Sequence, residues 1–267
     1  EAIQGLHDHP DGVAGYDLGP MTQEAALDAG AECLAAEAEA VQRDGDRWVV
    51  VSADGPVRAR AVVLAPGSRL RALNVPGEDR LVGKGVSHCA SCDAPLLRGR
   101  AVAVVGGGDA ACQEALTIAA HAAHVHLLVR GQALRATTVW RDRVAAQPRI
   151  TPRFGVVVEE ILGEATVHGV RLAGGEVLAV DAVFVYAGLV PHTGWLGGLV
   201  PLDGDGRIVV DDGMHTPIAG LLAAGTARSG SSGQAAQAVA DGIAAARAAQ
   251  RYLESCVWPA QGQTSAT

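Results

Sequence analysis

The chain has 267 residues, enough for one large or two ordinary domains, because single hydrophobic cores rarely grow beyond about 250–300 residues. Apolar residues make up 49% of the sequence and charged residues 19%, which excludes a disordered chain. The net charge of -8 argues against a nucleic-acid partner, since no basic stripe is available to contact phosphates. No apolar run approaches the roughly 18 residues of a membrane span and no signal peptide leads the chain. We therefore expect a cytoplasmic α/β protein.

Taken in chain order, the first part predicts a loop, a helix and an antiparallel sheet. The Gly- and Pro-rich stretch 7–20 is expected to be a loop, and 22–30 a short helix capped by Gly30. Turn dipeptides predict a three-stranded meander over 38–65, which closes on a buried strand at 62–65. Pro76-Gly77 is a candidate linker.

The centre of the chain predicts a βαβ unit. An apolar strand at 102–105, a helix over 109–120 and a second strand at 125–129 follow one another within about 30 residues. The remaining expected elements are strands at 155–158, 169–172 and 182–186 and a long Ala-rich helix over 234–255.

A glycine motif, Gly106-x-Gly108-x-x-Ala111, lies between the first strand and the helix of this unit. Glycine is needed where the backbone turns tightly and approaches a pyrophosphate, and a small third residue lets the helix pack against the strand. The helix N-terminus favours phosphate through its dipole and free N–H groups. A plain glycine-rich turn is the alternative, but the strand–turn–helix context favours nucleotide binding. We assign Gly106, Gly108, Asp109 and Ala111 to the cofactor site.

The end of the second strand indicates which nucleotide binds. NAD sites place an acid there for the ribose 2′-hydroxyl, whereas a 2′-phosphate favours Arg. Here the strand ends in Arg130, Arg135 follows, and no acid comes directly after the strand. These could be solvated surface arginines in an Arg-biased protein, but we favour NADPH.

A second motif is Cys89-Ala-Ser-Cys92-Asp93. Two cysteines at this spacing can form a labile disulfide, bind half a zinc site or occur by chance, and zinc would need two more ligands. We prefer redox use of Cys89 and Cys92 and expect no metal. Asp93 is either a proton donor with a raised pKa or an ordinary helix N-cap.

The other cysteines and a histidine cluster are expected to be structural. A free Cys most often behaves as a small core residue, and the histidines straddle a helix end and a strand, so their side chains should point apart. These residues are Cys33, Cys112 and Cys256, and His121, His124 and His126.

Together these motifs resemble the low-molecular-weight, bacterial-type thioredoxin reductases. The likeness begins at the CxxCD motif, continues through the glycine turn, and covers most of the chain from about residue 9 to 254. Further segments that carry it are Ala65-Pro-Gly67, Val75-Pro-Gly-Glu78, Phe184-Val-Tyr-Ala-Gly188-Leu-Val-Pro191 and Thr216-Pro-Ile-Ala-Gly220-Leu-Leu-Ala-Ala-Gly225.

The resemblance implies an α/β flavoprotein with two Rossmann-like nucleotide-binding domains, the NAD(P) domain being inserted into the FAD domain. It places the FAD domain at 1–75 and 195–256, the NAD(P) domain with the CxxC motif at 76–194, and a flexible tail at 257–267. NADPH would reduce FAD, FAD would reduce the disulfide, and the dithiol would reduce a partner. By the same resemblance Cys92 is the flavin-proximal sulfur and Cys89 the interchange thiol.

The resemblance also assigns further residues to cofactor binding. Gln234 and Ala235 would begin the last helix beside the flavin, where the helix dipole stabilises negative charge. The remaining assigned residues are Ala65, Gly67, Gly188, Gly225 and Thr226.

The sequence departs from the family pattern at several of these points. Thr226 stands where the family has Asp, Gly233 where it usually has Arg, and Arg130-Gly131 where it usually has two arginines. The family's first strand-GxGxxG-helix unit for FAD does not occur in the sequence, and Glu1 is an unlikely translation start. We therefore expect a further N-terminal segment and poor FAD binding by residues 1–267 alone.

The same residues allow other functions. Electrons could flow from a small dithiol to oxygen, as in a flavin-dependent dithiol oxidase, or the protein could be a degenerate, non-catalytic nucleotide binder. The expected partner is a thioredoxin-like protein or a small dithiol or disulfide, with no nucleic acid or membrane, and the family implies a homodimer.

Overall fold

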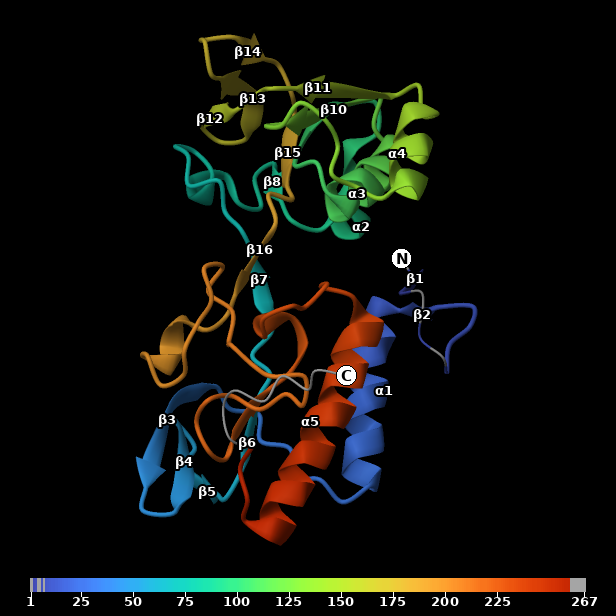
Figure 1. Cartoon of the computed structure of the whole chain (residues 1–267). Helices are drawn as coiled ribbons and strands as arrows, with labels where there is room; N and C mark the ends of the chain where they lie inside the picture. Colours follow the sequence, from blue (N-terminus) through green and yellow to red (C-terminus); the bar gives the residue numbers. More distant parts are fainter. Residues whose placement is uncertain (1, 4–5, 7, 260–267) are drawn as a thin grey trace. The chain divides into compact units, whose positions relative to one another are not determined.

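The computed structural model describes residues 2–3, 6 and 8–259, and the chain divides into two units (Figure 1). Unit 1 consists of Glu1–Arg69 and Val190–Thr267, and unit 2 is Leu70–Leu189. The second unit is therefore inserted in the sequence of the first. The chain passes between them within two short paired strands, β7 (Ser68–Leu70) and β16 (Leu189–Pro191).

A five-stranded parallel sheet with the order β11-β10-β9-β15-β8 is the centre of unit 2. Parallel strands that are covered on both faces have continuously apolar sequences, because side chains on both faces are buried. This explains Ala-Val-Ala-Val-Val in β9 and Ala-Val-Phe-Val in β15, whose residues are nearly all buried. The strands and helices are β8 (Val86–Ser87), α2 (Ala90–Asp93), β9 (Ala101–Val105), α3 (Asp109–Ala119), β10 (His124–Val129), α4 (Thr138–Ala145), β11 (Ile150–Phe154) and β15 (Ala182–Val185).

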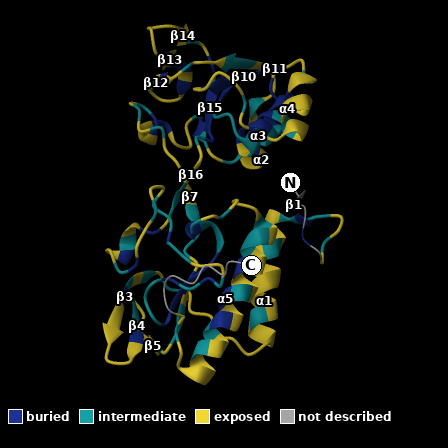
Figure 2. Cartoon of the chain, viewed as in Figure 1, coloured by how far each residue is buried: buried dark blue, intermediate teal, exposed yellow. Residues whose placement is uncertain are grey.

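Each face of this sheet has its own core (Figure 2). On one face, α3 contributes Ala111, Ala115 and Ile118 to a cluster that also holds Phe184. On the other face, Leu128 and Val183 belong to a cluster with residues of a small antiparallel sheet. That sheet consists of β12 (Val158–Gly163), β13 (Val167–Leu172) and β14 (Val177–Leu178).

Unit 1 is centred on two parallel strands, β6 (Val62–Leu64) and β17 (Leu221–Ala223). An antiparallel meander packs beside them, with buried Trp48 in its second strand, and α5 (Ala235–Ser255) covers Leu222 and Ala224. The meander consists of β3 (Ala38–Asp44), β4 (Arg47–Ser52) and β5 (Val57–Ala59). Unit 1 also contains the helix α1 (Gly15–Asp28) and the short elements β1 (Ala2–Ile3), β2 (Val13–Ala14), η3 (Gly194–Leu196) and η4 (Gly225–Ala227), while η1 (Asp79–Leu81) and η2 (Ala94–Leu97) belong to unit 2.

Three local expectations from the sequence are wrong. Helix α1 begins at Gly15 inside the expected loop and contains Pro20, which has no N–H to donate to the helix. Of the strand expected at 155–158, residues 155–157 form the connection between β11 and β12, where Gly155 has a φ of 69°, and Val158 alone lies in a strand, as the first residue of β12. The expected linker Pro76-Gly77 is packed instead, since the Pro76 carbonyl accepts from the Ile161 N–H at 2.9 Å.

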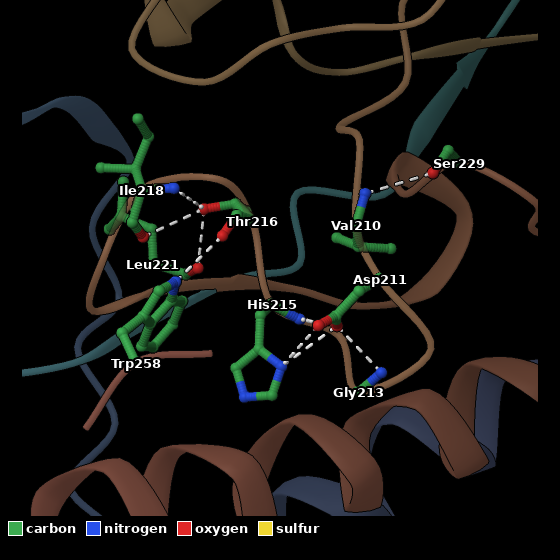
Figure 3. Close-up of polar contacts among 9 residues, drawn as sticks. All are labelled: Val210, Asp211, Gly213, His215, Thr216, Ile218, Leu221, Ser229 and Trp258. Carbon is green, nitrogen blue, oxygen red and sulfur yellow. Dashed lines mark hydrogen bonds and ion pairs between the residues drawn. The ribbon is translucent and has the colours of Figure 1, made fainter. Parts of the chain in front are cut away.

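The end of α5 is followed by a contact that ties down the chain (Figure 3). The His215 imidazole faces the Asp211 carboxylate, with Nδ1 3.0 Å from Oδ1, and its ring meets the edge of Trp258. The Trp258 indole N–H donates to the Thr216 carbonyl at 3.2 Å. Trp258 is therefore packed although we expected a flexible tail from residue 257, and residues 260–267 lie outside the described part of the chain.

Two histidines of β10 lie side by side rather than pointing apart. His124 and His126 are two residues apart on one strand, so they share a face, and their ring centroids are 4.4 Å apart. Burial, then His124 and Arg153, lower the pKa of His126 below its ordinary 6.5. The His126 Nδ1 atom has no hydrogen-bond partner among the described residues. The folded protein therefore favours neutral His126.

This gives a pH dependence of stability. Above the ordinary pKa of 6.5, His126 is neutral in both states and contributes no pH dependence. As the pH falls below 6.5, the unfolded chain binds a proton that folded His126 resists, so stability is lost, by up to about 1.4 kcal/mol per pH unit. Urea unfolding at pH 7.5 and 5.5 should show a smaller loss in His126→Gln than in the wild type. His168→Gln, at an exposed position on β13, is the control, and an equal loss in all three proteins would contradict the assignment.

Candidate functional site

The glycine turn after β9 has the close contacts that its sequence predicts. Gly106 has a φ of 148°, and a Cβ atom there would lie 2.3 Å from the Tyr186 carbonyl oxygen and 2.9 Å from the Ala111 Cβ. A side chain at Gly106, or one larger than methyl at Ala111, would therefore push α3 away from the sheet. A Cβ at Gly108 would meet nothing within 4 Å, so the space before the N-terminus of α3 is open. This cradle fits a dinucleotide phosphate.

The loop after β10 lies against this turn. The Arg135 N–H donates to the Gly107 carbonyl at 2.7 Å, and the Thr137 N–H donates to Asp109 Oδ1 at 2.6 Å. Arg130 and Arg135 are both exposed and available to a ligand. Guanidinium groups suit a 2′-phosphate, so these residues fit NADPH.

The cysteine motif forms a disulfide at the start of α2. The two Sγ atoms are 2.08 Å apart and the Cα atoms 5.3 Å apart. Cys92 is exposed and Cys89 is partly buried, so the bond is reachable from solvent. Asp93 is the last residue of α2, and its N–H donates to the Cys89 carbonyl at 3.1 Å. Asp93 also occupies the N-cap position of the following η2, although its side chain forms no capping hydrogen bond there.

Two hydroxyl groups bind the backbone of the segment Cys89–Asp93, which we call the redox turn. The Cys89 N–H donates to Ser87 Oγ at 3.0 Å, and the buried Ala90 N–H donates to the Tyr186 hydroxyl at 3.2 Å. Tyr186 thus contacts the redox turn through its hydroxyl, while its carbonyl faces Gly106. This role of Tyr186 was not predicted from the sequence. The one feature of the sequence that could have indicated it is the position of Tyr186 directly after the buried strand β15.

The three remaining cysteines differ in their surroundings. Cys112 is fully buried in α3, and burial, together with Asp109, raises its pKa to about 11. It therefore stays a thiol at neutral pH. Cys33 and Cys256 are exposed, so the expectation of core positions is wrong for both. The described residues contain no cluster of three or more histidine, cysteine or acidic side chains that could hold a metal.

Four of the residues that the resemblance assigns to cofactor binding lie in unit 1, at the carboxyl ends of β6 and β17. Ala65 and Gly67 follow β6, and Gly225 and Thr226 follow β17. Because these two strands are parallel neighbours, both turns lie at one edge. The Ser68 hydroxyl donates to Thr226 Oγ1 at 3.0 Å. Gln234 is the N-cap of α5 and Ala235 its first residue, while Gly188 lies in unit 2 with a φ of 111°.

A cavity of about 400 Å³ lies along β6 in the same unit. Its walls are mostly apolar, with one acid and one histidine, which is the character of a site for a flat organic ligand. The lining residues are Glu37, Ala38, Val41, Val50, Val62, Val63, Leu64, Ala65, Pro66, His192 and Trp195. The cavity reaches the turn after β6 at Ala65 and Pro66, one of the two turns that the resemblance assigns to the flavin.

A buried ion pair positions the turn after β17. Asp241 of α5 accepts from the Arg228 guanidinium at 2.6 and 2.8 Å and from the Gly225 N–H at 3.1 Å. Both side chains are at least 89% buried. The pair was not predicted from the sequence, although an acid within an Ala-rich helix is a visible signal of a buried charge.

Known proteins resemble most of this chain. The family model of pyridine nucleotide-disulphide oxidoreductases matches residues 8–242. The thioredoxin reductase of Treponema pallidum is 35% identical over 248 residues, which are 91% of this chain and 80% of that protein. The bifunctional thioredoxin reductase/thioredoxin of Mycobacterium leprae is 37% identical over 91% of this chain and 55% of its own length.

A solved structure supports the same relationship. The thioredoxin reductase of Lactococcus lactis superposes with a TM-score of 0.88 at 29% identity, covering 95% of this chain and 85% of that one. The expected fold class, α/β with two Rossmann-like domains, is therefore confirmed.

The Arg228–Asp241 pair can be tested through stability. Removing one partner leaves the other charge buried and unpaired, so Asp241→Ala should lower the free energy of unfolding by about 3–5 kcal/mol. The exposed Asp44–Arg58 pair is the matched control, and Asp44→Ala should cost less than about 1 kcal/mol. Urea unfolding measures both, and equal losses would mean that the buried pair does not hold this turn.

Proposed function

The chain belongs to the pyridine nucleotide-disulphide oxidoreductase family, and on that premise we propose that it is an NADPH-dependent flavoprotein disulfide reductase of the thioredoxin-reductase type. The observation that carries the proposal is the Cys89–Cys92 disulfide in the same unit as the nucleotide turn. Tyr186 contacts both, so the redox turn and the phosphate cradle share one support. Members of the family use FAD and NADPH.

The bound cofactors supply a hydride from NADPH and carry its two electrons through FAD to the disulfide. In unit 2, Gly106 and Gly108 admit the pyrophosphate to the α3 N-terminus, and Arg130 and Arg135 bind the 2′-phosphate. In unit 1, the turns after β6 and β17 and the start of α5 hold the flavin. The α5 N-terminus stabilises negative charge there.

The cysteines then transfer the electrons to a substrate. In the reduced protein, the Cys89 thiolate attacks a disulfide sulfur of the partner, which forms a mixed disulfide and releases a partner thiolate. Cys92 next attacks Cys89, restoring the internal disulfide and releasing the second thiolate. Asp93, adjacent to Cys92, donates a proton to the thiolate that leaves during reduction of the internal disulfide.

The substrate is a thioredoxin-like protein disulfide. The relative in Mycobacterium leprae is named a bifunctional reductase and thioredoxin, so reductase and substrate there belong to one protein. The enzyme works in the cytoplasm as a homodimer. Within the described part of the chain, no helix is both long and apolar enough to cross a membrane.

The redox role of the disulfide predicts separable half-reactions. In the FAD-loaded protein, Cys92→Ser should abolish NADPH-dependent reduction of thioredoxin yet leave flavin reduction by NADPH unchanged, because that step uses no thiol. Asp93→Asn should slow only the thiol half-reaction, since an amide does not donate the required proton. Stopped-flow absorbance follows the two steps separately.

The control for these variants is Cys256→Ser, which removes an exposed cysteine outside the motif. Wild-type reduction of thioredoxin by Cys89→Ser/Cys92→Ser would overturn the reductase proposal. Oxygen consumption with a small dithiol, without thioredoxin reduction, would favour the dithiol oxidase. A purified protein with neither a flavin spectrum nor turnover would favour the non-catalytic binder.

Nucleotide choice gives a second prediction. A charge-assisted hydrogen bond contributes about 1.5–3 kcal/mol, so Arg130→Ala should raise the NADPH KM about tenfold or more. The NADH KM should change little, because NADH has no 2′-phosphate. Arg100→Ala removes an exposed arginine at the amino end of β9, opposite the cradle, and should change neither value. Equal effects of Arg130→Ala on both nucleotides would refute the assignment.

A further inference from the structure

The loop that carries Arg130 and Arg135 is fastened to its surroundings by its backbone. Its first part is held by the Gly155 N–H, which donates to the Gly131 carbonyl at 2.9 Å. Its last part is held twice by the nucleotide turn, through the Arg135 N–H to the Gly107 carbonyl and the Thr137 N–H to Asp109. The arginines project from a loop whose path is fixed before any ligand binds.

The contact with Asp109 is the one side-chain contact among these three. Its carboxylate oxygen Oδ1 is 2.6 Å from the Thr137 nitrogen, which is a short, charge-assisted hydrogen bond across 28 residues of sequence. Asp109 is also the first residue of α3, where a carboxylate is favoured by the helix dipole. An incoming phosphate is attracted to the same helix end, so a carboxylate facing it would repel the ligand. The bond to Thr137 directs the carboxylate to the loop.

From this geometry we infer that Asp109 is a positioning residue for nucleotide specificity: it holds Thr137, and through it Arg135, where a 2′-phosphate binds. Asp109 therefore acts on the NADPH site without touching the cofactor, in contrast to its earlier assignment as a cofactor-binding residue. The inference rests on the proposed use of NADPH.

The physical reason is preorganisation. Arg135 gains its full interaction with a phosphate only if the backbone that carries it is already ordered, since ordering it on binding costs entropy. Loss of the Asp109 bond leaves the Arg135 contact with Gly107 as the one remaining bond of this loop to the nucleotide turn, while Thr137 stays joined to α4 through its carbonyl, which accepts from the Trp140 and Arg141 N–H groups. NADH does not use Arg135 in this way. A role of Asp109 limited to stabilising α3 would instead affect both nucleotides alike.

Two pairs of variants separate these roles. Asp109→Ala removes the acceptor, whereas Asp109→Asn keeps an oxygen acceptor without the charge. Thr137 has a φ of -61°, close to the value fixed by proline, so Thr137→Pro fits the backbone but removes both the N–H donor and the hydroxyl, whereas Thr137→Ala removes the hydroxyl alone and keeps the N–H. Binding of NADP⁺, NAD⁺ and 2′,5′-ADP to the FAD-loaded full chain is measured by calorimetry, and thermal unfolding reports on folding.

Asp109→Ala and Thr137→Pro should each weaken binding of NADP⁺ and 2′,5′-ADP about tenfold, because the loop must then be ordered when the ligand binds, with NAD⁺ changed less than about twofold. Asp109→Asn and Thr137→Ala should keep most of the preference for NADP⁺. The double variant Asp109→Ala/Thr137→Pro should be no weaker than either single one, because both remove the same bond.

The inference is overturned if Asp109→Ala keeps the wild-type preference for NADP⁺, or if it weakens NADP⁺ and NAD⁺ equally. If Thr137→Pro does not fold, the comparison of Asp109→Ala with Asp109→Asn decides the question. A wild-type protein that binds NAD⁺ as tightly as NADP⁺ overturns the proposed nucleotide, and the inference with it. A wild-type preference without any effect of Asp109→Ala overturns the inference alone.

Discussion

The approach of two backbones at the end of the parallel sheet is the constraint on which unit 2 depends. Gly106 lies against the Tyr186 carbonyl at a distance that excludes any Cβ atom. This contact lets β9 turn sharply into α3, and it brings the helix N-terminus to the carboxyl edge of the sheet. The hydroxyl of the same tyrosine accepts from the Ala90 N–H, so Tyr186 contacts both the nucleotide turn and the redox turn.

In unit 1, the turn after β17 is positioned by a buried ion pair instead of close backbone packing. Its central sheet has only two paired parallel strands among the described residues, which offers little rigidity to the turn at Gly225. Asp241 reaches this turn from α5 and is neutralised by Arg228. A buried ion pair adds little net stability compared with apolar packing, but it specifies one geometry when every polar atom is bonded. These bonds fix the position of α5 relative to the turn at Gly225.

Much of the fold of unit 2 could be predicted because its signals are local. The strand, glycine turn and helix around Gly106 each follow from the residues within a few positions, and the disulfide follows from a short motif. In unit 1, by contrast, the glycines and Pro20 of the stretch 7–20 predict a loop, whereas α1 begins at Gly15 and includes Pro20. In β10, the shared strand face of His124 and His126 followed from a period of two, which the expectation of divergent side chains overlooked.

The contacts that position the site could not be predicted in the same way. Thr137 and Asp109 are 28 residues apart, and Ala90 and Tyr186 are 96 apart, so only the folded chain brings them together. Most of these bonds also use a backbone N–H, which every residue except proline possesses and which leaves no mark in the sequence. Residue types can indicate a cofactor, but the path of the loop that recognises it depends on the tertiary fold.

The disulfide closes a ring between two residues only three positions apart. The loop entropy removed from the unfolded chain by such a small ring corresponds to about 2 kcal/mol, well below that of a bond joining distant segments. Because α2 is a single turn and its neighbours are fastened by Ser87 and Tyr186, opening the ring releases little chain. Opening this disulfide therefore changes the free energy of unfolding less than opening a disulfide between distant segments would, so the redox state of the pair is only weakly coupled to folding.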